Sequence, residues 1–399
     1  TGLNGKLAMV RGKENKYFII AEADNINFDN YIENMPEDIA SADFSDKVNY
    51  RFKQLEFLKD KDVQFRLNLN SGIWGKIPFE KLEADGVLKN GVLKLSGLSL
   101  GDVASAQIAA RGEISGFGDE IQFKNLNYGI SVKDNAAFTE RMEISLPKIK
   151  FNNLLQFTSK GVITGGLKRM AVKSTSKLGD VDAAYKGEIS KNEGKYDLNG
   201  KIELRNNDFV RMLNNFSINY NPEYPLGLLK FSADIKGNSS ALLLKNLNAN
   251  IGANNFAGEL LFIEKEGRNV FKANLNINKF EFERFFYNTN TRAELSAFRP
   301  KGEKVPFLSK PLLSKAKIDY DWSKNLDIEA KINAGKITLR DQNLTNASWI
   351  MVLNKQVLKI AQFTAEKDKG IVNTDFELNI PAGNKLIGKL NLSNINLNK

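Results

Sequence analysis

Apolar and polar residues alternate with a period of two along much of the chain. The run Val63–Leu69 has apolar side chains at its odd positions and polar side chains between them. The same pattern recurs in Phe271–Ile277, Leu326–Ile332 and Phe376–Ile380. Because successive side chains of a strand point to opposite faces, each run predicts a strand with one apolar and one polar face.

Turn residues separate these runs at hairpin spacing, as at Lys89–Gly91 and Asn192–Lys195, which favours an antiparallel meander. Helical signals are few. They predict one short helix at Asp208–Leu213, a second at Phe282–Phe286, and a third within Pro36–Leu58. The predicted fold is therefore mainly β, a long curved antiparallel sheet with a few short helices.

An internal repeat bears on the domain organisation. Gly5–Met9 resembles Gly258–Phe262, which lies 253 residues downstream, and Phe18 matches Phe271 at the same offset. Such repetition indicates supersecondary units stacked in a quasi-linear array rather than independent globules. We therefore expect residues 1–399 to form one continuous body. Further matches give the approximate limits of the two copies and of the strands between them: 5–130, 258–395 and 131–257.

A long sheet with one apolar face must cover that face, and a two-layer sandwich, a closed barrel and a lengthwise groove all do so. Immunoglobulin-type sandwiches would show modules of about 100 residues, which the 253-residue offset does not favour. The chain has 26 Phe beside 10 Tyr and 3 Trp, whereas Tyr and Trp dominate the girdles of membrane barrels. Sandwich-like closure and a curved groove both remain, because periodicity does not separate them.

A groove of this kind would suit an acyl chain. About 20 to 25 strands spaced by roughly 4.8 Å would extend over roughly 100–120 Å. Exposing a 16-carbon chain to water costs above roughly 10 kcal/mol at about 0.8 kcal/mol per CH₂, and an apolar trough removes most of this cost. The alternative is that the apolar face packs on itself, as it does in most sheets.

The absence of two residue types restricts the chemistry. The chain contains neither histidine nor cysteine, which excludes Ser-His-Asp and Cys-His catalysis, disulfides, and zinc sites built on imidazole or thiolate. Asp319 and Asp321 offer carboxylates on one strand face, a spacing that a metal site or a glycosidase could use, although a polar strand face is the simpler interpretation. Gly116–Gly118 and Gly165-Gly166 lack the setting of a nucleotide-binding loop and are interpreted as turns. We expect no enzyme activity, no cofactor and no metal.

The charge balance favours anionic partners without indicating nucleic acid. The formal net charge is +10, from 57 basic and 47 acidic residues. The lysines are spread evenly rather than gathered on one face with interleaved aromatics, so no nucleic-acid partner is expected. No apolar run reaches the 18 residues typical of a membrane-spanning helix, and the sequence begins at Thr1. We therefore expect any membrane anchor to lie outside these residues.

Several segments resemble the AsmA-like family of bacterial envelope proteins. The resemblance begins in Val63–Leu69 and continues in Ile77–Leu82 and Asn90–Leu95, a strand, a turn and a Gly-Val-Leu strand in succession. Leu242–Gly252, followed by Phe256–Leu260, is similar to another signature of the family. The matches are short but span most of residues 5–395. The membrane helix that precedes this region in the family is missing here.

This resemblance implies a repeating β-groove in the periplasm, anchored to the inner membrane by a segment outside this chain. It also implies a bridge that moves phospholipid between the inner and outer membranes, with acyl chains as its partner. The family offers no catalytic residues to carry over. Alternation within the strands gives the residues expected to line the groove: Phe65, Leu67, Leu69, Leu93, Leu95, Leu244, Leu260, Phe262, Phe271, Leu275, Ile328, Ile332, Phe376 and Leu378.

Two further functions stay open. The first is a structural or assembly scaffold of the envelope. The alternating segment 391–398 predicts a last strand with an open edge, where an outer-membrane or periplasmic protein could pair. The second is a carboxylate-based enzyme acting on envelope polysaccharide, for which Asp319 and Asp321 would be the site.

Overall fold

The structure is a computed structural model in which most of the chain is described. The residues described are 3–10, 16–31, 35–40, 42–141, 155–192, 194–216, 220, 222, 224–281, 284–285, 323–339, 342–381 and 385–395. The chain divides into two compact units, residues 1–201 and 202–399, which are treated separately below. The expectation of one continuous body stays a prediction.

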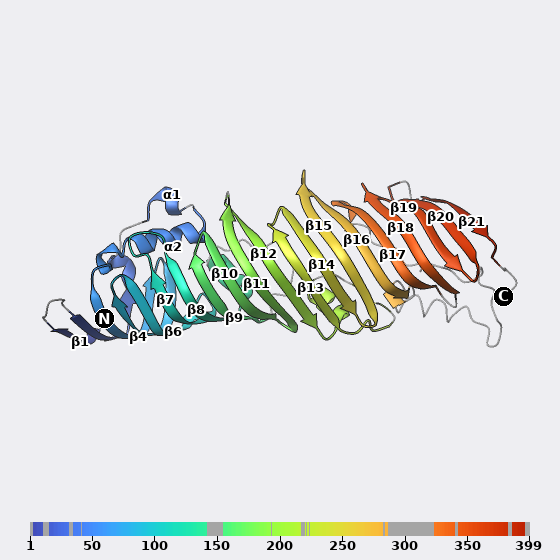
Figure 1. The fold of residues 1–399 in the computed structure, drawn as a ribbon. Coiled ribbons are helices and arrows are strands. Elements are labelled where there is room, and N and C mark those ends of the chain that lie inside the picture. The colour runs from blue at the N-terminus through green and yellow to red at the C-terminus, as the bar shows by residue number, and fades with distance from the viewer. Residues whose placement is uncertain are drawn as a thin grey trace. The chain divides into compact units, whose positions relative to one another are not determined.

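The chain is mainly β, as predicted (Figure 1). Strands of 8 to 14 residues make up most of both units, and the helices are few and short. The strands of the first unit are β1 (Leu3–Val10), β2 (Lys16–Ala23), β3 (Ile26–Asn27), β4 (Asp62–Trp74), β5 (Ile77–Lys89), β6 (Val92–Val103), β7 (Ala106–Ser115), β8 (Gln122–Val132), β9 (Phe157–Gly166), β10 (Arg169–Leu178) and β11 (Val181–Asn192). Strand β12 (Lys195–Asn206) crosses the boundary between the units. The strands of the second unit are β13 (Leu229–Gly237), β14 (Ala241–Ile251), β15 (Asn254–Lys265), β16 (Arg268–Glu281), β17 (Leu326–Leu339), β18 (Gln342–Asn354), β19 (Val357–Lys367), β20 (Gly370–Asn379) and β21 (Lys385–Ser393).

The short helices fall mainly where the sequence predicts them. The segment 36–58 contains α1 (Glu37–Ala40), α2 (Phe44–Lys53) and the 3₁₀ turn η2 (Glu56–Leu58), while η1 (Phe28–Asn30) and α3 (Asn135–Arg141) are also short. Helix α4 (Phe209–Asn215) is capped by Asp208, whose side chain accepts a hydrogen bond from the Arg211 amide. The helix predicted at 282–286 lies largely outside the described residues.

Within the described residues neighbouring strands pair antiparallel except at two junctions, so the all-antiparallel prediction is wrong at these positions. In the first unit β4 pairs in parallel with β2 and β3, and in the second unit β17 pairs in parallel with β16. A parallel neighbour requires a connection of about a dozen residues or more, and the chain supplies one in each case. In the first unit this connection carries the helices α1 and α2.

Tight turns join most of the antiparallel strands, although β8 and β9 are joined by residues 133–156. Between β5 and β6 only Asn90 and Gly91 intervene, with φ of 50° and 69°. Positive φ at both central residues is the geometry of a type I′ turn, whose twist matches that of the strands. The turn between β11 and β12 contains Gly194, with φ of 75°. Both turns stand where the sequence predicts them.

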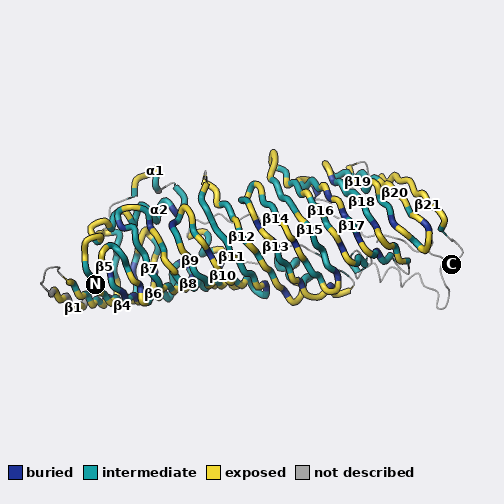
Figure 2. The backbone as a smooth tube through the Cα atoms, in the orientation of Figure 1, coloured by how far each residue is buried: buried dark blue, intermediate teal, exposed yellow. Residues whose placement is uncertain are grey.

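The hydrophobic clusters are built from single sheet faces. In the second unit the cluster around Ala330 and Ile332 draws its members from neighbouring strands, β15 to β19. In the first unit the cluster of Ala23, Leu69 and Phe79 draws on β2 to β6 and η1. Few described residues from outside the strands pack on these clusters: Phe28 of η1 belongs to the first-unit cluster, and Phe285 stacks on Phe280 of the second-unit cluster with ring centroids 5.1 Å apart. Figure 2 accordingly shows strands that are mostly exposed or intermediate, with few buried positions.

Candidate functional site

The cross-strand register places the predicted lining residues of the second unit on one face. Leu244 of β14 lies opposite Leu260 of β15, and Phe262 of β15 lies opposite Phe271 of β16, with ring centroids 5.2 Å apart. In the parallel pair, Phe271 is the partner of Ile328. Directly paired residues share a face, so these side chains form a continuous apolar row across the unit.

The same face continues to β20. Leu275 of β16 is paired with Ile332 of β17, and farther along the sheet Phe376 and Leu378 of β20 are paired with residues of β19. We call this the apolar face of the second unit. It comprises the row above together with the odd positions 271–277 of β16, the even positions 328–334 of β17, and their partners up to β21.

The first unit has an apolar face of its own. Phe65 of β4 lies opposite Gly86 of β5, where its ring occupies the place of a side chain: a Cβ added at Gly86 would lie 3.1 Å from that ring. Gly86 is also opposite Leu95 of β6, which places Phe65 and Leu95 on the same face. The predicted residues Leu67 and Leu69 share this face by alternation along β4, as does Leu93 along β6.

Most of the predicted lining residues are only half-buried. Leu69, Leu95 and Ile332 are buried, while Phe376 is 37% exposed. The remaining predicted residues are intermediate. Residues of a filled two-layer core would be more fully covered. The structure therefore places all predicted residues on apolar faces that the described residues cover incompletely, and their contact with lipid stays a prediction.

Phe18 and Phe271 match in the sequence repeat, but they lie on different faces of their strands. Phe18 is paired with Ala8 and Gln64, lies on the polar side of β2, and is 38% exposed. Phe271 lies on the apolar face of β16. The difference arises because a shift of one residue moves a strand's side chains to the opposite face.

A hydroxyl patch interrupts the apolar face of the first unit, and sequence reasoning missed it. Tyr128 of β8, Ser159 of β9 and Ser176 of β10 share this face. The Ser176 hydroxyl donates to Ser159 Oγ at 2.9 Å, and Tyr128 Oη lies 3.2 Å from Ser159 Oγ. A side chain at Gly161 would approach the Tyr128 ring to 3.0 Å, so glycine leaves room for that ring to lie across β9.

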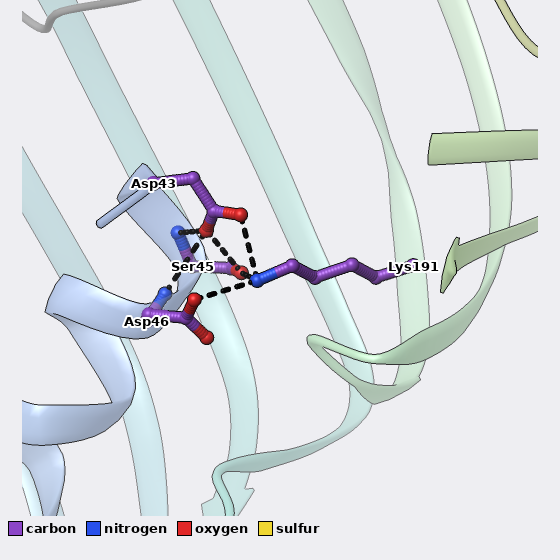
Figure 3. A network of polar contacts seen from close by, with 4 residues as sticks. All are labelled: Asp43, Ser45, Asp46 and Lys191. Carbon is purple, nitrogen blue, oxygen red and sulfur yellow. Dashed lines mark hydrogen bonds and ion pairs between the residues drawn. The ribbon is translucent and has the colours of Figure 1, made fainter. Parts of the chain in front are cut away.

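A second missed feature fixes helix α2 to the sheet (Figure 3). Lys191, near the end of β11, reaches the first turn of α2, where its Nζ lies 2.6 Å from Asp43 Oδ2 and 2.8 Å from Asp46 Oδ2. Lys191 Nζ also donates to Ser45 Oγ at 3.2 Å. Asp43 is at the same time the N-cap of α2 and accepts hydrogen bonds from the amides of Ser45 and Asp46.

The electrostatics of this latch, formed by Lys191, Asp43, Ser45 and Asp46, follow from its contacts. Burial acts to raise the pKa of the Asp43 carboxyl, but hydrogen bonds from Lys191, Ser45 and the Asp46 amide outweigh burial and lower it. Burial acts to lower the pKa of Lys191, but its bonds to Asp43 and Asp46 raise it overall. Both groups are therefore held in their charged forms.

Helix α2 is attached at two further points. The rings of Phe52 and Phe117 stack with centroids 4.6 Å apart, and Phe117, in the turn after β7, is buried. Asn49 Oδ1 accepts a hydrogen bond from the Ile121 amide at 3.5 Å. In Figure 1 the helix lies beside the ends of the strands of the first unit. Since Lys191 alternates with Ile189 onto the apolar face, α2 stands at the margin of that face.

An ion pair spans the parallel junction of the second unit. Arg268 at the start of β16 donates from Nε and Nη2 to the two carboxylate oxygens of Asp327 on β17, at 2.8 and 2.6 Å. Its Nη1 also donates to the Lys324 carbonyl oxygen at 2.7 Å. The hydrogen bonds from Arg268 lower the pKa of the Asp327 carboxyl despite its partial burial.

The structure gives no support for the other sites considered in the sequence. Asp319 and Asp321 lie outside the described residues. Gly116 and Gly118 have positive φ in the turn between β7 and β8, whereas Gly165 and Gly166, where a turn was predicted, are the last two residues of strand β9. Within the described residues no cluster of acidic side chains could hold a metal ion, and no helix there is long and apolar enough to cross a membrane.

No protein-family model matches the chain, and no curated protein matches its sequence. The function is therefore inferred from the chemistry of the two apolar faces.

Proposed function

We propose that the protein binds lipid acyl chains against its apolar faces and moves phospholipid along them between two membranes. One observation supports this proposal above the others: apart from Phe28 of η1, the hydrophobic clusters of both units draw on neighbouring strands of a single face, and most of the predicted lining residues stay half-exposed. Apolar surface left open over many strands marks a binding surface rather than a completed core.

The dimensions of the second unit fit an elongated apolar ligand. Nine neighbouring strands, β13 to β21, spaced by about 4.8 Å extend its apolar face over roughly 40 Å. Each CH₂ group buried there gains about 0.8 kcal/mol relative to water. Since this gain is non-directional, an acyl chain can shift along the face without losing a specific contact.

The cellular setting rests on the resemblance to the AsmA-like family. From this resemblance we propose a periplasmic location, an inner-membrane anchor outside this chain, and a role as a bridge toward the outer membrane. The proposal assigns the protein no catalysis, cofactor or nucleic-acid partner.

A pair of matched variants on one strand tests lipid binding. In Leu275→Lys a charge enters the apolar face beside Ile332, whereas Asn274→Lys places the same charge on the exposed polar face of β16. A charge against hydrocarbon costs roughly 2.5–3.5 kcal/mol at most, and less where the side chain reaches water. Leu275→Lys should therefore reduce bound lipid by about tenfold, and Asn274→Lys should leave it unchanged.

The measurement is native mass spectrometry of gently extracted protein, together with extraction of a fluorescent phospholipid from vesicles. Circular dichroism of both variants checks that the fold is retained. Wild-type protein that is reproducibly free of lipid and extracts none would refute the proposal, as would equal lipid binding by the two lysine variants.

One observation favours an assembly scaffold as a second candidate function. All nine residues of β21 are exposed, and its recorded pairing within the described residues is with β20 alone. Leu386 and Leu390 are each 62% exposed. A strand with an open edge and apolar side chains can be extended by a strand of a partner protein. If this is the function, Leu275→Lys should leave it intact, whereas Leu390→Pro should abolish it.

A further inference from the structure

The apolar face of the first unit changes from aliphatic to hydroxyl-bearing side chains between β8 and β10. Along one cross-strand row the residues are aliphatic as far as Ile130, and the next two positions are serines. In order, the row consists of Leu69, Leu82, Leu100, Ile108, Ile130, Ser159 and Ser176. In the adjacent row Tyr128 is followed by Gly161 and Ser174. Four hydroxyl groups of β8 to β10 thus gather on a face whose earlier strands, β4 to β7, are aliphatic along this row.

The hydrogen bonds within this patch leave it able to bind a further group. Tyr128, Ser159 and Ser176 carry three O–H donors, and the two bonds among them use two of these donors. One donor is left to point beyond the triad, and Ser174 adds a fourth hydroxyl on the same face. A polar group on an apolar face is costly unless it is hydrogen-bonded, so a ligand that covers the patch must supply an acceptor.

The surrounding charges indicate which acceptor fits. The lysines of the neighbouring strands, Lys160, Lys173 and Lys177, are exposed and alternate onto the polar face. Lys191 does alternate onto the apolar face, but it is engaged by two carboxylates. With no other described cation of β9 to β11 on this side, a phosphate would lack a counter-charge at the patch. A neutral acceptor is favoured.

We propose that the hydroxyl patch binds the ester carbonyl groups of an acyl lipid whose hydrocarbon chains lie on the adjacent aliphatic rows. The inference rests on the proposed function, because it presumes that acyl chains occupy this face. It adds a defined position for the bound lipid. The carbonyl oxygens lie at the patch, the acyl chains extend toward β4 to β7, and the head group remains in water.

The test compares two phospholipids that differ only in the linkage. Dipalmitoyl phosphatidylglycerol has ester carbonyls, and its dihexadecyl ether analogue has the same head group without them. Competition of each against a fluorescent phospholipid gives their relative affinities for the full chain. One net hydrogen bond corresponds to a preference of about five- to tenfold for the ester lipid.

Variants that remove only oxygen atoms locate the source of the preference. Ser159→Ala, Ser174→Ala and Ser176→Ala combined with Tyr128→Phe should bring the ester-to-ether ratio to about one. Thr175→Ala, on the exposed opposite face of β10, is the matched control and should keep the wild-type ratio. Near-ultraviolet circular dichroism verifies the packing of each variant.

The outcomes separate this inference from the function on which it rests. If wild-type protein binds both lipids equally well, the ester site is refuted and the lipid-binding proposal stands. Persistence of the preference in the quadruple variant would also refute the site. If the wild type binds neither lipid, both the proposed function and the ester site are refuted.

Discussion

The latch between Lys191 and helix α2 should stabilise the first unit measurably. In Lys191→Met the apolar stem is kept and the ammonium group is lost, so Asp43 and Asp46 keep their charges without their cation. The Lys191 side chain is 13% exposed, but the carboxylates of Asp43 and Asp46 are 33% and 46% exposed. Exposed pairs contribute about 0.2–1 kcal/mol, and breaking fully buried pairs costs about 3–5 kcal/mol. We therefore expect a loss of about 1–2 kcal/mol.

A double-mutant cycle isolates the ion pair from other effects of the substitution. Asp43→Asn removes the charge but keeps a good N-cap, because Asn and Asp cap helices about equally well. The cycle of Lys191→Met with Asp43→Asn should give a coupling of about 1 kcal/mol in urea unfolding, and hydrogen exchange of the α2 amides should be faster in each single variant. Coupling below about 0.3 kcal/mol would show that the contact contributes nothing beyond packing.

The pH dependence of the latch follows from the directions of the two pKa shifts. The pKa of Asp43 is lowered from 3.8, so its contribution is present above that value and is lost as the pH falls through the folded-state pKa. The pKa of Lys191 is raised from 10.5, so its contribution is present below that value and is lost as the pH rises through the folded-state pKa. The stability difference between wild type and Lys191→Met should be constant near neutral pH and shrink at both extremes.

Other predictions concern the second unit. Gly258 has φ of +147°, and a Cβ there would collide with the Asn274 carbonyl oxygen, whereas Gly267 has φ of +72° with open space around it. Gly258→Ala should thus cost more than about 3 kcal/mol in urea unfolding and Gly267→Ala only about 1 kcal/mol, and equal costs would contradict this reasoning. Arg268→Ala should lower the urea midpoint and speed amide exchange at the β16–β17 junction. Arg268→Lys should recover little of the lost stability, because lysine lacks the planar guanidinium group that binds both carboxylate oxygens of Asp327. The Arg268→Ala effect should shrink in acid, since the contribution of Asp327 is lost as the pH falls below its lowered pKa.

Alternation of residue types was sufficient to predict strands and faces. Each run of the Val63–Leu69 kind became a strand, and every predicted lining residue lies on an apolar face. Strand direction was not predictable in this way, because an alternating pattern is the same for parallel and antiparallel neighbours. The helical insertion at 36–58 could have indicated the parallel pairing of β2 with β4, since antiparallel neighbours need only a short turn.

The hydroxyl patch and the Lys191 latch could not be predicted from the sequence for a related reason. Ser159 and Ser176 occupy apolar-face positions, but serine at such a position only weakens the alternation and does not mark a patch. Tyr128 joins them through register across strands, which is absent from the linear pattern. Lys191 resembles any other lysine at a strand end, and its partners on α2 lie about 145 residues earlier in the chain.

The two parallel junctions also bear on how the chain folds. Almost every strand meets its partner through a turn of a few residues, so most native pairings have a short sequence separation and can form rapidly by local zippering. The pairings of β2 and β3 with β4, of β8 with β9, and of β16 with β17 must close longer loops first, at an entropic cost that grows with the logarithm of loop length. We therefore expect these distant pairings, rather than the hairpins, to limit the rate at which each unit assembles.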